Sequence, residues 1–221
     1  MTQQLPYKAI DERIFREAVA FLSKRDPVMA KLIVKYSDRP FPYPVGVIPA
    51  LLRAVVAQQI SNRAAATLWK KLQVFLGKDS SLWCQRLSES SIESIRVLGI
   101  NERKAMTLKT VSEKFLMGEW SEVGFASMDD ESVSKTLRSI KGIGPWTASA
   151  VLIFGLGRCD VLPLTDYGIR VALAQLYLDD KTAVSEGLQR LKTRVKSIEC
   201  TWEPYRTVAA WYLWCSLENS P

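Results

Sequence analysis

The chain has 221 residues, of which 48% are apolar, and its formal net charge is +7. This length suits one domain or two small lobes, the apolar content argues against disorder, and the positive charge favours a polyanionic partner. Histidine is absent and the four cysteines form no CxxC pair, which excludes Ser-His and Cys-His nucleophiles and argues against a zinc site.

The apolar pattern predicts helices nearly throughout, and no stretch alternates convincingly with a period of two. We therefore predict an all-α protein of about ten helices. The Pro-rich segment 39–49 is predicted to be a connector that leads into a helix, Ser61 to cap the following helix, and Ser90 with Glu93 to form a capping box. The predicted helices span 10–23, 51–61, 62–76, the segment after Ser90, 101–117, 131–140, 145–156, 167–177, 183–197 and 204–217.

No apolar run is long enough to cross a membrane, and the first residues are too charged for a signal peptide. We expect an intracellular protein with reduced, mostly buried thiols and no contact with a membrane.

The stretch SIKGIGPWTA, residues 139–148, joins two of the predicted helices through a turn with two glycines. Gly142 and Gly144 permit positive φ values and leave the backbone amides before the Pro145 helix bare, which suits a phosphate. A purely structural helical hairpin also favours glycine there, so GxG alone leaves both interpretations open.

The longer pattern resembles the helix-hairpin-helix superfamily of DNA glycosylases, in the branch of 3-methyladenine DNA glycosylase II. The similarity is carried in order by LLRAVVAQQIS, LGINERKA, IKGIGPWTA, VLPLTDYGIR and WEPYRTVAAWYLW, over roughly residues 45–217. The resemblance implies two helical lobes with the active-site cleft between them and no extra N-terminal β domain. We expect one lobe from about 1–48 plus 168–221, and a second from about 49–167 that contains the hairpin 137–149.

Asp166, in LPLTDYGIR, lies at a predicted loop–helix junction. By itself it is interpreted as an N-cap, but the resemblance places the family's catalytic carboxylate here, and the two roles are compatible. A fixed carboxylate can stabilise the oxocarbenium-like sugar that forms when an N-glycosidic bond breaks, and can orient the attacking water.

The resemblance also implies a base pocket formed by Trp146, Tyr167 and Trp214, whose rings would attract a cationic alkylated base. Packing is the alternative for any tryptophan in a helical core, and we expect Trp69, Trp202 and Trp211 to be core residues. A pocket tyrosine of some relatives aligns with Ala150.

DNA contacts follow from the same resemblance. The wedge that fills the gap left by a flipped base is expected at Gln59, with Gln58 and Ile60 beside it. The phosphate-binding hairpin and the carbonyl groups that could hold a structural sodium or potassium ion are then assigned to specific residues. The hairpin residues are Lys141, Gly142, Ile143, Gly144, Trp146 and Thr147, and the carbonyls are those of Arg138, Ile140 and Ile143.

Strand-cutting members of the superfamily resemble this pattern with a lysine where this chain has Trp146, so the implied enzyme is monofunctional and leaves an abasic site. The C-terminal segment lacks the clustered cysteines of an iron–sulfur cluster, so we expect no required cofactor. The expected function is hydrolytic excision of 3-methyladenine and 7-methylguanine from duplex DNA by a monomer. The alternatives are a non-catalytic DNA-damage binding protein and a glycosylase for oxidised or mismatched bases.

Overall fold

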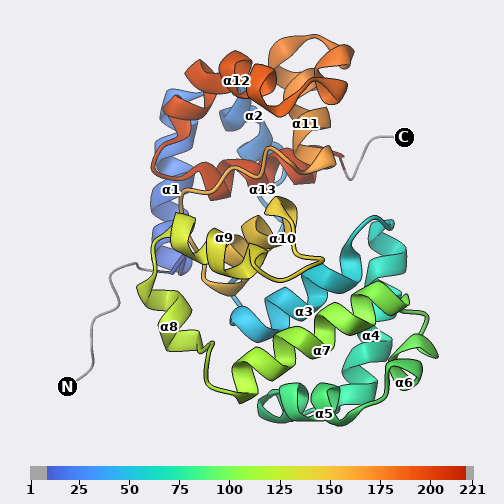
Figure 1. Cartoon of the computed structure of the whole chain (residues 1–221). Helices are drawn as coiled ribbons and strands as arrows, with labels where there is room; N and C mark the ends of the chain where they lie inside the picture. Colours follow the sequence, from blue (N-terminus) through green and yellow to red (C-terminus); the bar gives the residue numbers. More distant parts are fainter. Residues whose placement is uncertain (1–8, 218–221) are drawn as a thin grey trace. The chain divides into compact units, whose positions relative to one another are not determined.

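The computed structural model describes residues 9–217, and this part of the chain consists of helices and connecting segments without a strand (Figure 1). The prediction of an all-α fold is confirmed. Of the described residues, 45–156 form one compact unit, unit 1, and 9–44 with 157–217 form a second, unit 2. The expected lobes had their boundaries near residues 48 and 167, and their ends at 1–8 and 218–221 lie outside the described residues.

Unit 1 is built around α3, whose sequence VIPALLRAVVA is apolar on nearly every side. Seven of its residues are buried, and it packs against α4, α7, α8 and α10 (Figure 1). A helix that is apolar all round needs neighbours on all sides, which explains its central position. The helices of unit 1 are α3 (Val47–Ala57), α4 (Asn62–Leu76), α5 (Trp83–Glu89), α6 (Ile92–Arg96), α7 (Glu102–Leu116), α8 (Glu122–Ser127), α9 (Asp130–Arg138) and α10 (Pro145–Ala150).

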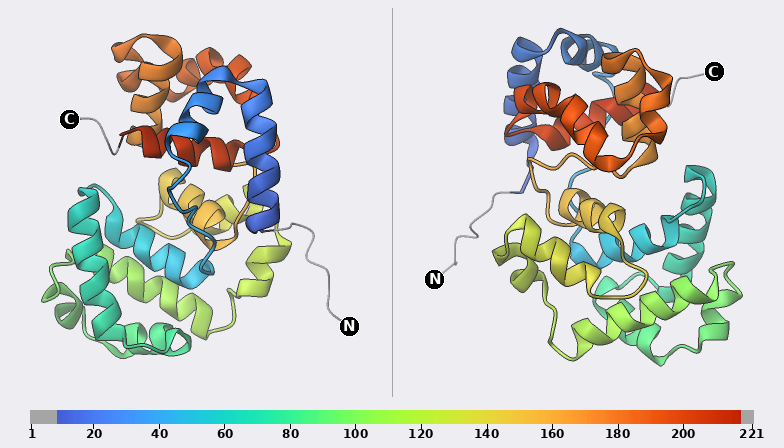
Figure 2. Two further views of the ribbon diagram at one scale, coloured as in Figure 1. Left: turned by 180° about the vertical axis from the view of Figure 1, so that it is seen from behind. Right: turned by 45° about the horizontal axis from the view of Figure 1, so that its top comes forward.

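Unit 2 has its own core, in which α13 packs against α1, α2, α11 and α12 (Figure 2). Asp26 caps α2 and is buried there, where it also accepts hydrogen bonds from Tyr177 and from the indole of Trp202. Trp202 is fully buried, which confirms it as a core residue. The helices of unit 2 are α1 (Glu12–Arg25), α2 (Pro27–Lys35), α11 (Tyr167–Leu173), α12 (Leu188–Trp202) and α13 (Arg206–Leu217).

The loop 157–166 belongs to unit 2, although the expected lobes placed it with the hairpin. The reason is a set of bonds to the start of α13. The guanidinium of Arg206 donates to both carboxylate oxygens of Asp160 at 2.7 and 2.8 Å. The hydroxyl of Thr207 accepts from the amide of Val161 at 3.0 Å and donates to the carbonyl of Arg158 at 2.6 Å.

Several local predictions need correction. Residues 9–217 form thirteen α-helices, whereas about ten were predicted. The prediction lacks α2, α5 and α8, because these short helices have too few residues for a clear periodic signal. Ser91, not Ser90, caps α6, and Ser90 ends α5 instead. The predicted helix 145–156 continues after α10 as a π-helical turn, Val151–Gly155, and the predicted helix 167–177 continues likewise at Ala174–Leu178. The segment 181–185 is a 3₁₀ helix and α12 starts only at Leu188.

Candidate functional site

Asp166 is the N-cap of α11, as its position in the sequence predicts. Its Oδ1 accepts a hydrogen bond from the amide of Ile169 at 2.9 Å, which is the usual capping contact. The same oxygen accepts a second bond from the indole Nε1 of Trp214, also at 2.9 Å. The carboxylate is therefore fixed by a backbone donor from its own helix and by a side-chain donor from α13.

Trp214 can approach this carboxylate because residue 168 is a glycine. A Cβ at Gly168 would lie 3.1 Å from Oδ1 of Asp166 and 3.4 Å from Cδ1 of Trp214, and both contacts are tight. Trp214 is half-buried and packs against the core of unit 2. The structure thus gives Trp214 a bond to the predicted catalytic residue, a contact that the sequence did not reveal.

Arg170 braces the loop that precedes Asp166. Its guanidinium donates to three backbone carbonyls, those of Leu164 at 3.1 Å, Val184 at 3.1 Å and Glu186 at 2.8 Å. Because Leu164 lies two residues before Asp166, these bonds hold the loop against the segment that leads to α12. In the sequence, Arg170 is simply the last residue of VLPLTDYGIR, and no local pattern predicts these three bonds.

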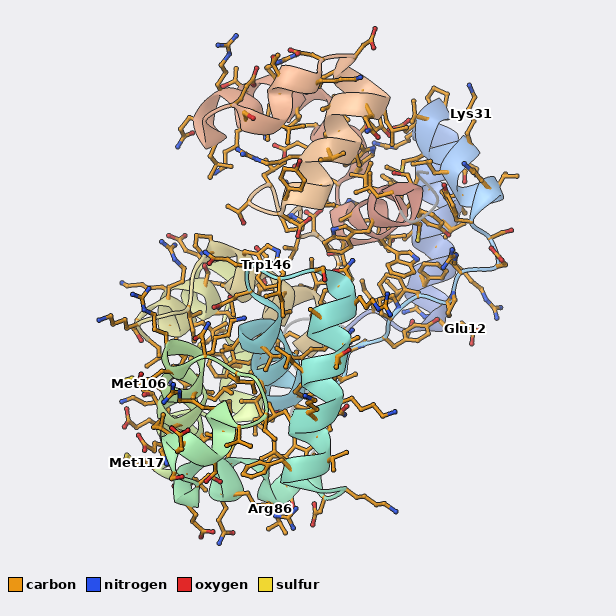
Figure 3. The ribbon with its side chains drawn as sticks, turned by 90° about the vertical axis from the view of Figure 1, so that its right-hand side faces the viewer. Glu12, Lys31, Arg86, Met106, Met117 and Trp146 are labelled. Carbon is orange, nitrogen blue, oxygen red and sulfur yellow. The ribbon has the colours of Figure 1, made fainter. Side chains whose placement is uncertain are left out.

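The remaining predicted pocket residues occupy different places. Tyr167 is the first residue of α11 and is 73% exposed. Trp146 is the second residue of α10 in unit 1, is half-buried, and is labelled in Figure 3. Within unit 2 the structure brings together Asp166 and Trp214, and the assignment of Trp146 and Tyr167 to one pocket stays a prediction. Trp211 and Trp69 are half-buried and make edge-on ring contacts with Phe41 and Trp83 respectively.

The hairpin 139–144 joins α9 to α10 as predicted. Gly142 has a φ of +97°, and a Cβ there would lie 2.4 Å from the hydroxyl of Thr107, so only glycine fits without a shift. Gly144 does not use the positive φ that glycine permits: its backbone is extended (φ −104°), and a Cβ there would meet open space. Gly144 is the N-cap of α10 and offers no side chain to the first-turn amides.

The other hairpin residues divide between surface and interior. Lys141 is exposed, whereas Ile143 and Thr147 are buried. The hydroxyl of Thr147 accepts a bond from the side-chain amide of Gln58, and at 1% exposure this side chain is not open to a phosphate. Of the three expected cation ligands, the carbonyl of Ile140 already accepts a bond from the amide of Ile143 at 3.1 Å. Bound sodium or potassium stays a prediction.

The expected wedge residues follow α3. Gln59 and Ile60 are exposed, and Gln59 has a φ of +56°, in the left-handed region that non-glycine residues seldom adopt. Gln58 does not match the expected role, because its side chain is committed to the hairpin. Its Nε2 donates to the carbonyl of Gly142 and to the hydroxyl of Thr147, each at 2.9 Å.

Residues 9–217 hold no group of three or more cysteine, aspartate or glutamate side chains arranged to ligate a metal ion. Over the same residues, every helix falls short of a bilayer crossing in its length or its apolar content.

Comparison with known proteins gives concordant results. The chain is 30% identical over 167 residues to DNA-3-methyladenine glycosylase 1 of Schizosaccharomyces pombe, a match that covers 74% of this chain and 69% of that protein. A Bacillus subtilis relative is 30% identical over 196 residues, which cover 86% of this chain and 66% of the relative. The chain thus spans about two thirds of the length of these curated relatives.

Among solved structures, the 3-methyladenine DNA glycosylase of Schizosaccharomyces pombe in complex with abasic DNA superposes with a TM-score of 0.74 at 28% identity. The superposition covers 92% of this chain and 98% of that one. No protein-family model matches the chain.

Proposed function

This chain belongs to the DNA-3-methyladenine glycosylase family, and on that premise we propose that it is a monofunctional DNA glycosylase for alkylated bases. It binds duplex DNA, rotates a damaged nucleotide out of the stack, and hydrolyses the N-glycosidic bond as the first step of base excision repair. Its place in the cell is with the DNA. The observation that carries the proposal is the doubly held carboxylate of Asp166 at the start of α11.

The chemistry follows from that carboxylate. When the bond between C1′ and the base nitrogen breaks, its electron pair leaves with the base and a positive charge develops on the sugar. Asp166 stabilises this charge because its carboxylate cannot rotate away while Oδ1 accepts two bonds. Water then attacks C1′, and its proton passes to the carboxylate or to solvent.

Alkylated purines suit a protein without histidine. A base alkylated at N3 or N7 carries a positive charge in DNA, and cleavage turns it into a neutral leaving group. No strong general acid is then needed to assist departure. This agrees with a chain that contains no histidine and whose proposed catalytic group is a single carboxylate.

Sequence-independent binding is assigned to the hairpin and to the basic residues. The amides after Gly144 and the exposed Lys141 would contact phosphates, which fixes the position of the protein but reads no base. The position at which strand-cutting members carry a lysine is Trp146, which cannot form a Schiff base. We therefore propose that the product is an intact strand with an abasic site.

Base release from methylated duplex DNA tests the proposal. The protein is incubated with the duplex, and the released bases are identified by chromatography while the strand is followed by denaturing electrophoresis. We expect free 3-methyladenine and 7-methylguanine, with strand breaks only after alkaline cleavage of the abasic site. Binding of damaged DNA without base release would instead support a binding module, and strand breaks without alkali would contradict the monofunctional assignment.

A further inference from the structure

The turn 58–61, between α3 and α4, holds a conformation that its sequence does not favour. Gln59 has a φ of +56°, and a non-glycine residue is strained in this left-handed region. Ser61 caps α4 through its hydroxyl, which fixes the far end of the turn. Such a conformation persists only when its surroundings determine it, so the contacts at the near end are informative.

Lys104 of α7 provides the first of these contacts. Its ammonium group donates to the carbonyls of Val56 and Gln58, each at 2.8 Å, at the C-terminal end of α3. Lys104 is only 9% exposed, and burial lowers its pKa. The unpaired carbonyls at a helix C-terminus carry partial negative charge, so they are good partners for a buried ammonium.

Gln58 provides the second contact, and it reaches the hairpin. Its amide donates to the carbonyl of Gly142 and the hydroxyl of Thr147, both on segments more than 80 residues away in sequence. Thr107, one turn after Lys104 on α7, has its hydroxyl 3.2 Å from the carbonyl of Lys141. One face of α7 therefore contacts both the turn and the hairpin.

We propose that Lys104 and Gln58 are positioning residues that fix the turn 58–61 to the hairpin before DNA binds. Lys104 holds the end of α3, Gln58 ties that end to the hairpin backbone, and Gln59 is thereby presented in its left-handed conformation. The hairpin and Gln59 then meet the duplex as one rigid body, so the enzyme spends no binding free energy on ordering the turn. This inference rests on the proposed function, because it assigns Gln59 to the step that opens the base stack.

The test uses Lys104→Met, which keeps the apolar stem and removes the three donors. Lys109→Met is the matched control, because Lys109 lies on the same helix and its ammonium donates to the carbonyls of Leu87, Ser88 and Ser90 at the end of α5. Both variants lose the same kind of contact, but only Lys104 contacts the turn. Gln58→Met is a second, independent variant that removes the bonds to the hairpin.

Single-turnover base release is measured on two duplexes. In one duplex the 7-methylguanine is paired with cytosine. In the other, the gapped duplex, it faces an abasic site in the opposite strand, so less stacking and pairing must be broken to flip it. We expect Lys104→Met and Gln58→Met to slow release about tenfold on the paired duplex and less than about threefold on the gapped one. Lys109→Met should stay within about twofold of wild type on both, since it lies away from the turn.

If the wild type releases the base, two results would overturn this inference and leave the proposed function intact. One is an equal loss of release rate on both duplexes in the folded variants. The other is an equal release rate for Lys104→Met and Lys109→Met. If Lys104→Met does not fold, Gln58→Met decides between the outcomes. A wild type that binds both duplexes and releases no base would overturn the proposed function, and the inference with it.

Discussion

Replacement of Asp166 by asparagine separates the structural and the chemical role of this side chain. Asparagine keeps an oxygen that can accept from the amide of Ile169 and from the indole of Trp214, and it caps helices as well as aspartate does. The variant loses the negative charge at the start of α11, which is worth about 0.3–1 kcal/mol of helix stability. We therefore expect Asp166→Asn to fold and to lose at most about 1 kcal/mol of unfolding free energy.

The effect on catalysis should be far larger. Two unit charges about 4 Å apart interact by about 4 kcal/mol at an effective dielectric constant of about 20, the value typical near a protein surface. A transition state that loses this stabilisation forms about 10³-fold more slowly. Since the bonds of Oδ1 are retained, we expect this loss in the rate of the chemical step and little change in DNA affinity.

The assay is single-turnover release of 7-methylguanine from duplex DNA, with affinity for an abasic-site duplex measured alongside. Asp166→Glu is a useful control, because it keeps the charge and moves it by one methylene. Equal release rates for wild type and Asp166→Asn would refute the electrostatic assignment. A variant that melts at a much lower temperature would show instead that the charge chiefly supports the fold.

Four further predictions concern Trp214, the two hairpin glycines and the effect of salt. Trp214→Phe keeps an aromatic face but loses the bond to Asp166 at 2.9 Å, so release should slow about tenfold to a hundredfold, whereas a rate equal to wild type would mean that only the ring matters. Gly142→Ala should destabilise the fold by about 1–3 kcal/mol in chemical denaturation, because its Cβ would meet Thr107. Gly144→Ala should cost less than about 1 kcal/mol but weaken binding to damaged and undamaged duplexes alike, and unchanged binding would contradict the phosphate role. Affinity should also fall at least tenfold between about 50 and 200 mM salt, and a flat response would argue against phosphate contacts.

Local sequence signals account for much of the fold and for the position of Asp166. N-caps and helix periodicity depend on neighbouring residues, so the caps at Ser61 and Asp166 and the turn at Gly142 could be predicted. The short helices could not, because a helix of six or seven residues shows less than two turns of pattern and is formed mainly by tertiary packing.

The contacts that position the site residues could not be predicted from the sequence. The bond from Gln58 to Gly142 joins residues 84 positions apart, and the bond from Trp214 to Asp166 joins residues 48 apart. No local pattern in the intervening sequence indicates that these pairs of residues are in contact. The same is true of Lys104, which the RKA string marks only as one of many basic residues and which the structure shows to be buried. The sequence also did not show which of the two hairpin glycines uses a positive φ: Gly142 does and Gly144 does not.

The start of α13 anchors the loop 157–166, and the same helix carries Trp214 further along. The loop that ends at Asp166 and the indole that donates to its carboxylate thus both depend on α13, whereas the hairpin proposed to contact phosphates is built on the core of unit 1. Damage to the core of unit 1 should therefore weaken DNA binding and leave the orientation of the Asp166 carboxylate unchanged. We therefore expect mutation to separate DNA binding from base release, so that inactive variants that still bind DNA can be obtained.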